Sequence, residues 1–66
     1  MRTIGDEPVY EVFARRAEGE PLRHVGSVAA PGDALARVYA RSIYDEFAWI
    51  EMVVVPRDAL VTVIAS

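Results

Sequence analysis

Two short segments rich in strand-forming residues, joined by a glycine- and proline-containing loop, constrain the fold of this chain more than any other feature. Residues 9–16 combine valine, tyrosine and phenylalanine, and residues 22–30 carry a second set of apolar residues. The intervening residues 17–21 read Ala-Glu-Gly-Glu-Pro, a composition that favours reversal of the chain. We therefore predict a β-hairpin, in which Gly26 marks a bulge or a close approach of the backbone.

A helix is expected directly after the hairpin. Pro31 suits the first position of a helix, and Asp33 places a negative charge near the positive end of the helix dipole. Large apolar residues then recur every four positions, with small residues one position on: Leu35, Tyr39, Ile43 and Phe47, beside Ala36 and Ala40. This spacing predicts an amphipathic helix of about four turns, starting near residue 31, whose alanines let it lie close to a sheet.

Two further strands complete the expected fold. Residues 52–55 read Met-Val-Val-Val, a run too apolar for a strand with one solvent-exposed face. Residues 50–55 should therefore form a central strand that is covered on both sides. Residues 60–64 alternate in character and predict a short last strand. The expected fold class is α+β, a small ββαββ roll with a four-stranded mixed sheet and one helix packed on one face. We expect residues 1–66 to form a single domain that begins with a flexible N-terminal segment, residues 1–7.

The chain is too short to bury a thick core. A domain of about 60 residues buries only about 60% of the surface of its unfolded chain, and there is no cysteine to form a disulfide. The hydrophobic fraction is nevertheless 53%, above the usual range of about 45–50%. Since one helix covers one face of a sheet, we expect the other face to meet another protein chain.

Charge and hydropathy exclude several classes of partner. The net charge is −3, lysine is absent and the seven arginines are scattered, so we expect no nucleic-acid partner. No apolar run approaches about 18 residues, and charges occupy residues 1–20, where a signal peptide needs an apolar stretch. These features predict a cytoplasmic protein with no membrane partner.

The residues that carry chemistry form no recognisable site. His24 is the only histidine, and on a strand Ser27 points to the opposite face, outside any nucleophile-elbow motif. The acidic pairs fall in a tail, a loop and a helix end, where solvated surface is the expected role: Asp6/Glu7, Glu18/Glu20 and Asp45/Glu46. We predict no catalytic residue, no metal and no cofactor. His24 is interpreted as a hydrogen-bonded histidine at an edge or interface, and Trp49 either closes the core or anchors an interface.

Several of these segments, in this order, resemble the phenylacetic acid degradation B family. The resemblance covers about residues 9–64 and rests on Tyr10-Glu11-Val12-Phe13, Arg15, His24-Val25-Gly26-Ser27, Ala40-Arg41, Tyr44 and Val54-Val55-Pro56. Typical members carry tryptophan at the position of Val53 and basic residues at the positions of Asp45 and Glu46. The order of the two four-residue signatures makes the resemblance fairly specific.

The resemblance implies a ubiquitin-like, β-grasp type of roll and a role without catalysis. It implies a structural, bridging subunit of a multicomponent phenylacetyl-CoA type ring oxygenase in aromatic degradation. The implied partners are the chain itself, as a homodimer or larger homo-oligomer, and the catalytic and helical subunits of a di-iron oxygenase. The expected contact residues are Tyr10, Phe13, Arg15, His24 and Trp49.

Two other functions remain as alternatives. One is a stand-alone, self-associating binding module of an unrelated pathway, which pairs through the apolar edge of its last strand, at Val61, Val63 and Ile64. The other is a small enzyme whose pocket forms across a symmetric interface with His24 from each chain.

Overall fold

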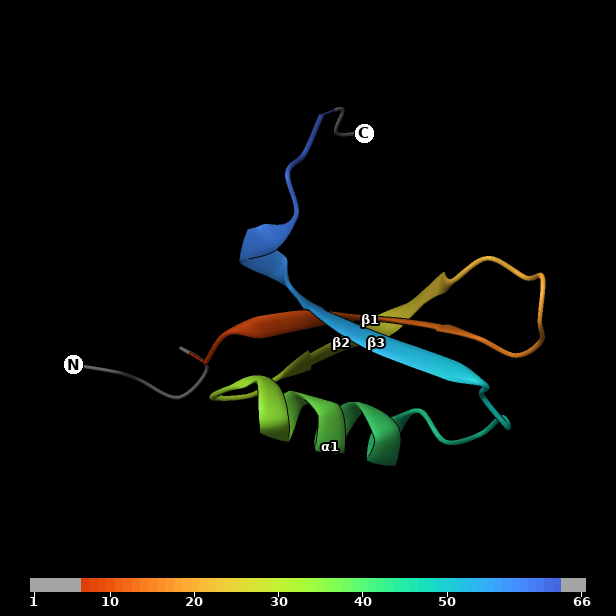
Figure 1. The fold of residues 1–66 in the computed structure, drawn as a ribbon. Helices are drawn as coiled ribbons and strands as arrows, with labels where there is room; N and C mark the ends of the chain where they lie inside the picture. Colours follow the sequence, from red (N-terminus) through yellow and green to blue (C-terminus); the bar gives the residue numbers. More distant parts are fainter. Residues whose placement is uncertain (1–6, 64–66) are drawn as a thin grey trace.

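The structure, a computed structural model, describes residues 7–63 and contains three strands, one α-helix and one short 3-10 helix in that range. Figure 1 shows helix α1 on one side of the sheet and the short 3-10 helix η1 on the other. The elements follow the order β1 (Val9–Arg15), β2 (Arg23–Ala29), α1 (Asp33–Ile43), β3 (Glu51–Pro56) and η1 (Arg57–Ala59). Apart from Glu7, the segment expected to be flexible at residues 1–7 lies outside the described residues.

The predicted hairpin is confirmed, with strand ends within one residue of those expected. Strands β1 and β2 pair antiparallel, and the Glu20 N–H donates to the Ala17 carbonyl at 3.2 Å to close the turn. Gly19 has φ of 84°, a conformation that a side chain makes costly. The register shifts beside Gly26, so that Val25 has no partner in β1. This irregularity agrees with the bulge expected at Gly26.

The predicted four-stranded ββαββ sheet is wrong. Within residues 7–63 the sheet has three strands in the order β2-β1-β3, and both pairs are antiparallel rather than mixed. The centre is β1, not the strand at residues 50–55, and Val12 and Ala14 on β1 are completely buried. Strand β3 lies at an edge, where residues 52–55 are only half-buried. These residues are apolar because α1 covers one face of β3 and η1 lies near the other face. In the described part of the chain they do not have a neighbouring strand on each side.

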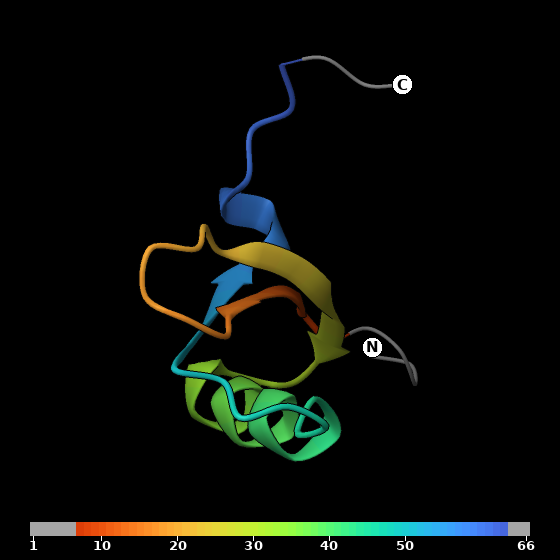
Figure 2. The same ribbon diagram turned by 90° about the vertical axis from the view of Figure 1, so that its right-hand side faces the viewer.

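In place of the last predicted strand, the described chain forms η1 and then a segment that is neither helix nor strand. After Pro56 the chain turns across the sheet face opposite α1, where Arg57 reaches Glu11. Residues 60–63 then run away from the sheet, as both ribbon views show (Figures 1 and 2). Val61 is 86% and Val63 is 88% exposed. Residue 64, the end of that predicted strand, lies outside the described residues.

Helix α1 packs on the sheet through its small residues. It starts two residues after the expected position and has 11 residues, about three turns rather than four. Ala36 and Ala40 are buried against a core formed by β1 and β2, with Tyr10, Val12, Val28 and Ala30. The stripe expected to fill the core lies at its margin instead, and each member is more than a third exposed: Leu35, Tyr39, Ile43 and Phe47.

The narrow sheet explains this helix position. A three-stranded sheet is narrow, so only the central stripe of the helix can pack on it. Ala36 and Ala40 form that stripe, and their small side chains let the helix backbone lie close to the sheet. Larger side chains on either side of the alanines therefore have no sheet below them. No helix among residues 7–63 is long and apolar enough to cross a membrane.

Candidate interaction surface

The sheet face opposite α1 is the candidate interaction surface, and we call it the open face. Side chains alternate between the two faces along a strand, and Tyr10, Val12 and Ala14 of β1 belong to the helix side. The alternate positions of β1 therefore point to the open face. Cross-strand partners in β2 and β3 add their side chains to it, so that the open face carries Glu11, Phe13, Arg15, His24, Val53 and Val55.

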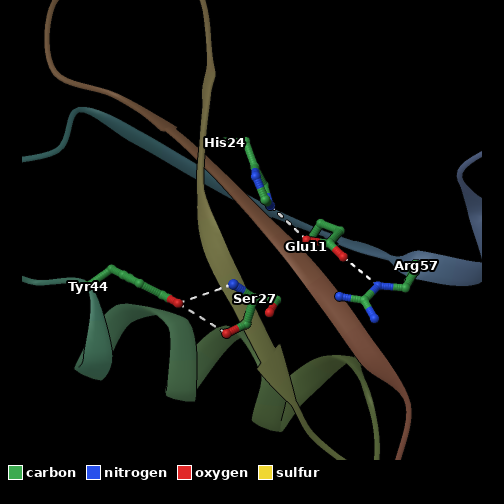
Figure 3. A network of polar contacts seen from close by, with 5 residues as sticks. All are labelled: Glu11, His24, Ser27, Tyr44 and Arg57. Atoms are coloured by element: carbon green, nitrogen blue, oxygen red, sulfur yellow. Dashed lines mark hydrogen bonds and ion pairs between the residues drawn. The ribbon is translucent and has the colours of Figure 1, made fainter. Parts of the chain in front are cut away.

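Glu11 is the centre of a polar network on the open face (Figure 3). One carboxylate oxygen lies 2.7 Å from His24 Nε2, and the other accepts a hydrogen bond from Arg57 Nε at 2.5 Å. The Glu11 side chain is only 11% exposed, whereas those of His24 and Arg57 are more than half exposed. One buried carboxylate thus ties together β1, β2 and η1 and holds two basic side chains at the surface.

The two basic partners also determine the charge state of Glu11. The hydrogen bond from Arg57, followed by that with His24, lowers the pKa of the Glu11 carboxyl, although burial acts in the opposite direction. Glu11 is therefore ionised at neutral pH. A buried carboxylate with two charge-assisted hydrogen bonds is stable where an unpaired one is costly.

Three of the five expected contact residues lie close together on the open face. Phe13 and His24 are cross-strand partners, and their ring centroids are 5.2 Å apart at an interplanar angle of 48°. Arg15, two positions after Phe13 on the same face, donates from Nε to Glu51 of β3 at 2.7 Å. The arrangement presents one aromatic ring, one imidazole and one arginine side by side. Aromatic residues and arginine are enriched in surfaces that bind other proteins, so this group has the composition of a protein contact surface.

Tyr10 has a different position. It is 5% exposed on the helix side of the sheet, and its hydroxyl donates to Asp33 Oδ1 at 2.8 Å, which links β1 to the first turn of α1. That hydrogen bond raises the pKa of the Tyr10 phenol, with additional contributions from burial and the negative charge of Asp33. The structure places Tyr10 in the core, and a contact role for it stays a prediction.

Trp49 lies in the loop between α1 and β3, on the helix side. Its indole N–H donates to the Tyr44 carbonyl at 2.6 Å, and its ring meets Phe47 edge-on with centroids 5.3 Å apart. The Arg16 guanidinium lies 4.2 Å from the centre of the Phe47 ring, which extends this aromatic group to the end of β1. Trp49 is half-buried, so both roles considered from the sequence remain predictions.

Tyr44 occupies the outer edge of β2. The Ser27 N–H donates to the Tyr44 hydroxyl, which in turn donates to the Ser27 carbonyl, both at 3.1 Å (Figure 3). A Cβ atom on Gly26 would overlap the Tyr44 ring and hydroxyl, which confirms the close approach expected at this glycine. The Ala30 N–H bonds to the Pro8 carbonyl, and bonded pairs alternate along an antiparallel ladder. The polar backbone groups of Ser27 therefore point outward, and Tyr44 satisfies them.

The main polar centre, Glu11 with Arg57, was not identified as a site from the sequence. A usable signal was present, because Glu11 is a charged residue inside an apolar strand, between Tyr10 and Val12. Its partner Arg57 is 46 positions away, and no local pattern links the two. Among residues 7–63 no group of three or more histidine, cysteine, aspartate or glutamate side chains could hold a metal ion.

Comparison with known proteins identifies a family to which the chain is similar. A family model described as phenylacetic acid degradation B matches residues 6–66. No curated protein and no solved structure matches the chain. The family match covers all the described elements, from β1 to η1, and confirms the resemblance seen in the sequence.

Proposed function

Because the chain belongs to the phenylacetic acid degradation B family, we propose that it is a non-catalytic structural subunit of a multicomponent oxygenase in that pathway. The enzyme is a di-iron oxygenase that acts on phenylacetyl-CoA or a related aromatic thioester. The chain bridges its catalytic and helical subunits in the cytoplasm and also associates with itself. The observation that carries this proposal is the family match over residues 6–66.

The open face supports a role in assembly. Aromatic residues and arginine are enriched where proteins bind one another, and Phe13, Arg15 and His24 lie together here. Contacts with Glu11 and Glu51 already restrict His24 and Arg15 in the free chain. A partner that binds them therefore loses less side-chain entropy on association.

The position of Trp49 supports a bridge rather than a single contact. Trp49 lies on the helix side of the sheet with Phe47. The exposed part of its ring and the open face therefore lie on different sides of the molecule. A bridging subunit needs two such surfaces. Tyr10 contributes indirectly, because its bond to Asp33 holds α1 against the sheet.

The proposal is tested by purifying the tagged chain from its native cells and identifying the bound proteins by mass spectrometry. We expect a large helical subunit with paired Glu-x-x-His motifs, the sequence signature of a di-iron site. The variants Arg15→Ala and His24→Ala should each weaken recovery of that subunit at least about fivefold. Glu18→Ala, which removes an exposed charged side chain in the loop between β1 and β2, is the control and should not. An oxygenase with full turnover in the absence of this chain would refute the bridging role.

A stand-alone, self-associating module is the second candidate. The exposed side chains of Val61 and Val63 favour it, since exposed apolar surface often marks a contact between proteins. Recovery of the chain only with itself, and without an oxygenase, is the result that this candidate predicts.

A further inference from the structure

The outer edge of β3 is an unpaired edge of the sheet in the described part of the chain. Within residues 7–63, β3 pairs only with β1. Along β1, the backbone groups of Tyr10 and Val12 point to β2, so those of Glu11 and Phe13 point to Val55 and Val53 of β3. The alternate residues of β3 therefore direct their N–H and C=O groups away from the sheet. These residues are Met52 and Val54.

An open groove lies beside this edge, between β3 and α1. It has a volume of about 670 Å³, and its apolar lining includes Val38, Trp49, Ile50, Met52 and Val54. Val38 is 55% exposed and Ile50 is 49% exposed, so the groove leaves apolar surface in water. An extended chain placed along β3 would gain backbone hydrogen bonds and bury this surface at the same time.

The other edge of the sheet is less suited to strand addition. On β2, the outward-pointing N–H and C=O of Ser27 are already bonded to the Tyr44 hydroxyl. An incoming strand would have to displace Tyr44 from its place under Gly26. The two edges therefore differ, and the edge of β3 is the one better suited to strand addition.

The segment that fits this edge belongs to the chain itself. Residues 60–63 form neither a helix nor a strand, Leu60 has an extended backbone, and Val61 and Val63 are almost fully exposed. The sequence from residue 59 to residue 65 reads Ala-Leu-Val-Thr-Val-Ile-Ala, without a charge, glycine or proline. Such a segment has a high tendency to add to a sheet edge when it is left uncovered.

We propose that two copies of the chain exchange these segments, so that residues 60–63 of each copy add as a strand to the outer edge of β3 of the other. Alternation places Val61 and Val63 on one side, in the groove beside Val38, and Leu60 and Thr62 on the other. The contact of Arg57 with Glu11 holds η1 on the open face, and the segment leaves in a direction away from α1 (Figure 2). The segment is thereby presented to a second copy. This inference rests on the self-association in the proposed function and specifies its geometry.

Variants on the two sides of the contact test the exchange in the full-length chain. Analytical ultracentrifugation should show a wild-type dimer. Val61→Asp/Val63→Asp, which alters the segment, and Val38→Glu, which alters the groove, should each weaken dimerisation roughly 100-fold. Ile43→Glu is the matched control, because Ile43 is 59% exposed on the same helix but does not line the groove. It should dimerise like the wild type.

Mixing the two defective variants tests reciprocity. The Val38→Glu chain keeps a normal segment, and the Val61→Asp/Val63→Asp chain keeps a normal groove, so the mixture should form a heterodimer with one exchanged strand. A mixture that stays monomeric overturns the proposal. It is also overturned by a monomeric wild type, by dimers that persist in either variant, or by equal loss of dimers in the Ile43→Glu control.

The outcome is separable from that of the proposed function. Recovery of oxygenase subunits with a monomeric wild-type chain would overturn the strand exchange and leave the bridging role intact. Dimers that depend on Val38 and Val61, in a chain that binds no oxygenase subunit, would support the exchange and refute the bridging role.

Discussion

Replacing Glu11 by glutamine should remove a large share of the stability of this small protein. Glutamine keeps the shape of the side chain but loses its charge, and one of its ends presents an N–H group to a hydrogen-bond donor. A hydrogen bond to a charged group contributes about 1.5–3 kcal/mol, but the exposure of His24 and Arg57 reduces each pair through solvent screening. We expect a loss of about 1–2 kcal/mol in the free energy of unfolding. A domain of this size has a total of about 3–10 kcal/mol.

Thermal unfolding followed by circular dichroism at pH 7 measures this effect. The expected loss lowers the melting temperature by about 5–15 °C. Glu51→Gln is the matched control, because it breaks the ion pair with Arg15, whose two side chains are 25% and 42% exposed. Such a surface pair contributes about 0–1 kcal/mol. Equal melting temperatures for the wild type and Glu11→Gln would refute the view that Glu11 organises the open face.

The pH dependence provides an independent check. The pKa of Glu11 is lowered in the folded chain, so its contribution is present above the ordinary value of 4.5 and is lost as the pH falls through the lowered folded value. The difference in stability between the wild type and Glu11→Gln should therefore shrink in acid. A difference that stays constant from pH 7 to about pH 3 would contradict the assignment.

Three further substitutions test the contacts of Gly26, Tyr44 and Tyr10. Gly26→Ala should displace the Tyr44 ring and lower the free energy of unfolding, measured in urea, by about 1–3 kcal/mol. Tyr44→Phe should lower it by only about 1 kcal/mol, through the lost hydrogen bonds with Ser27. Equal stability of Gly26→Ala and the wild type would contradict the close approach of Tyr44 to Gly26. The pKa of Tyr10 is raised from its ordinary value of 10.0, so its contribution is present below that value and is lost as the pH rises through the folded one. Tyr10→Phe should be less stable than the wild type at pH 7 and should lose less stability in alkaline solution, as melting curves across that range would show.

Local signals predicted the elements whose partners are near in sequence. The hairpin followed from two strand-forming runs around Gly19, and its β1 and β2 have nearly the predicted ends. The alanines of α1 correctly indicated that the helix lies close to the sheet. Small side chains allow such a close approach whatever the arrangement of the strands. The close approach at Gly26 was also recognisable, although its cause, the Tyr44 ring, was not.

The errors in the expected fold share one origin. Residues 60–64 have strand propensity, but propensity does not specify a partner, and η1 directs the chain across the open face instead of back along β3. The apolar run at residues 52–55 indicated burial without indicating what covers it. Likewise, Leu35 and Ile43 fit the helical period, yet a three-stranded sheet is too narrow to cover them.

The sequence by itself therefore determined the hairpin, the helix, the third strand and the family, since each depends on residue types at short or ordered spacings. Only the tertiary structure decided which strand is central, which edges are closed, and that Glu11 meets His24 and Arg57. The physical reason is that strand order and long-range ion pairs depend on the path of the connecting segments. That path is set by the sum of many weak contacts, such as those of η1 with β1, and no single local pattern encodes it.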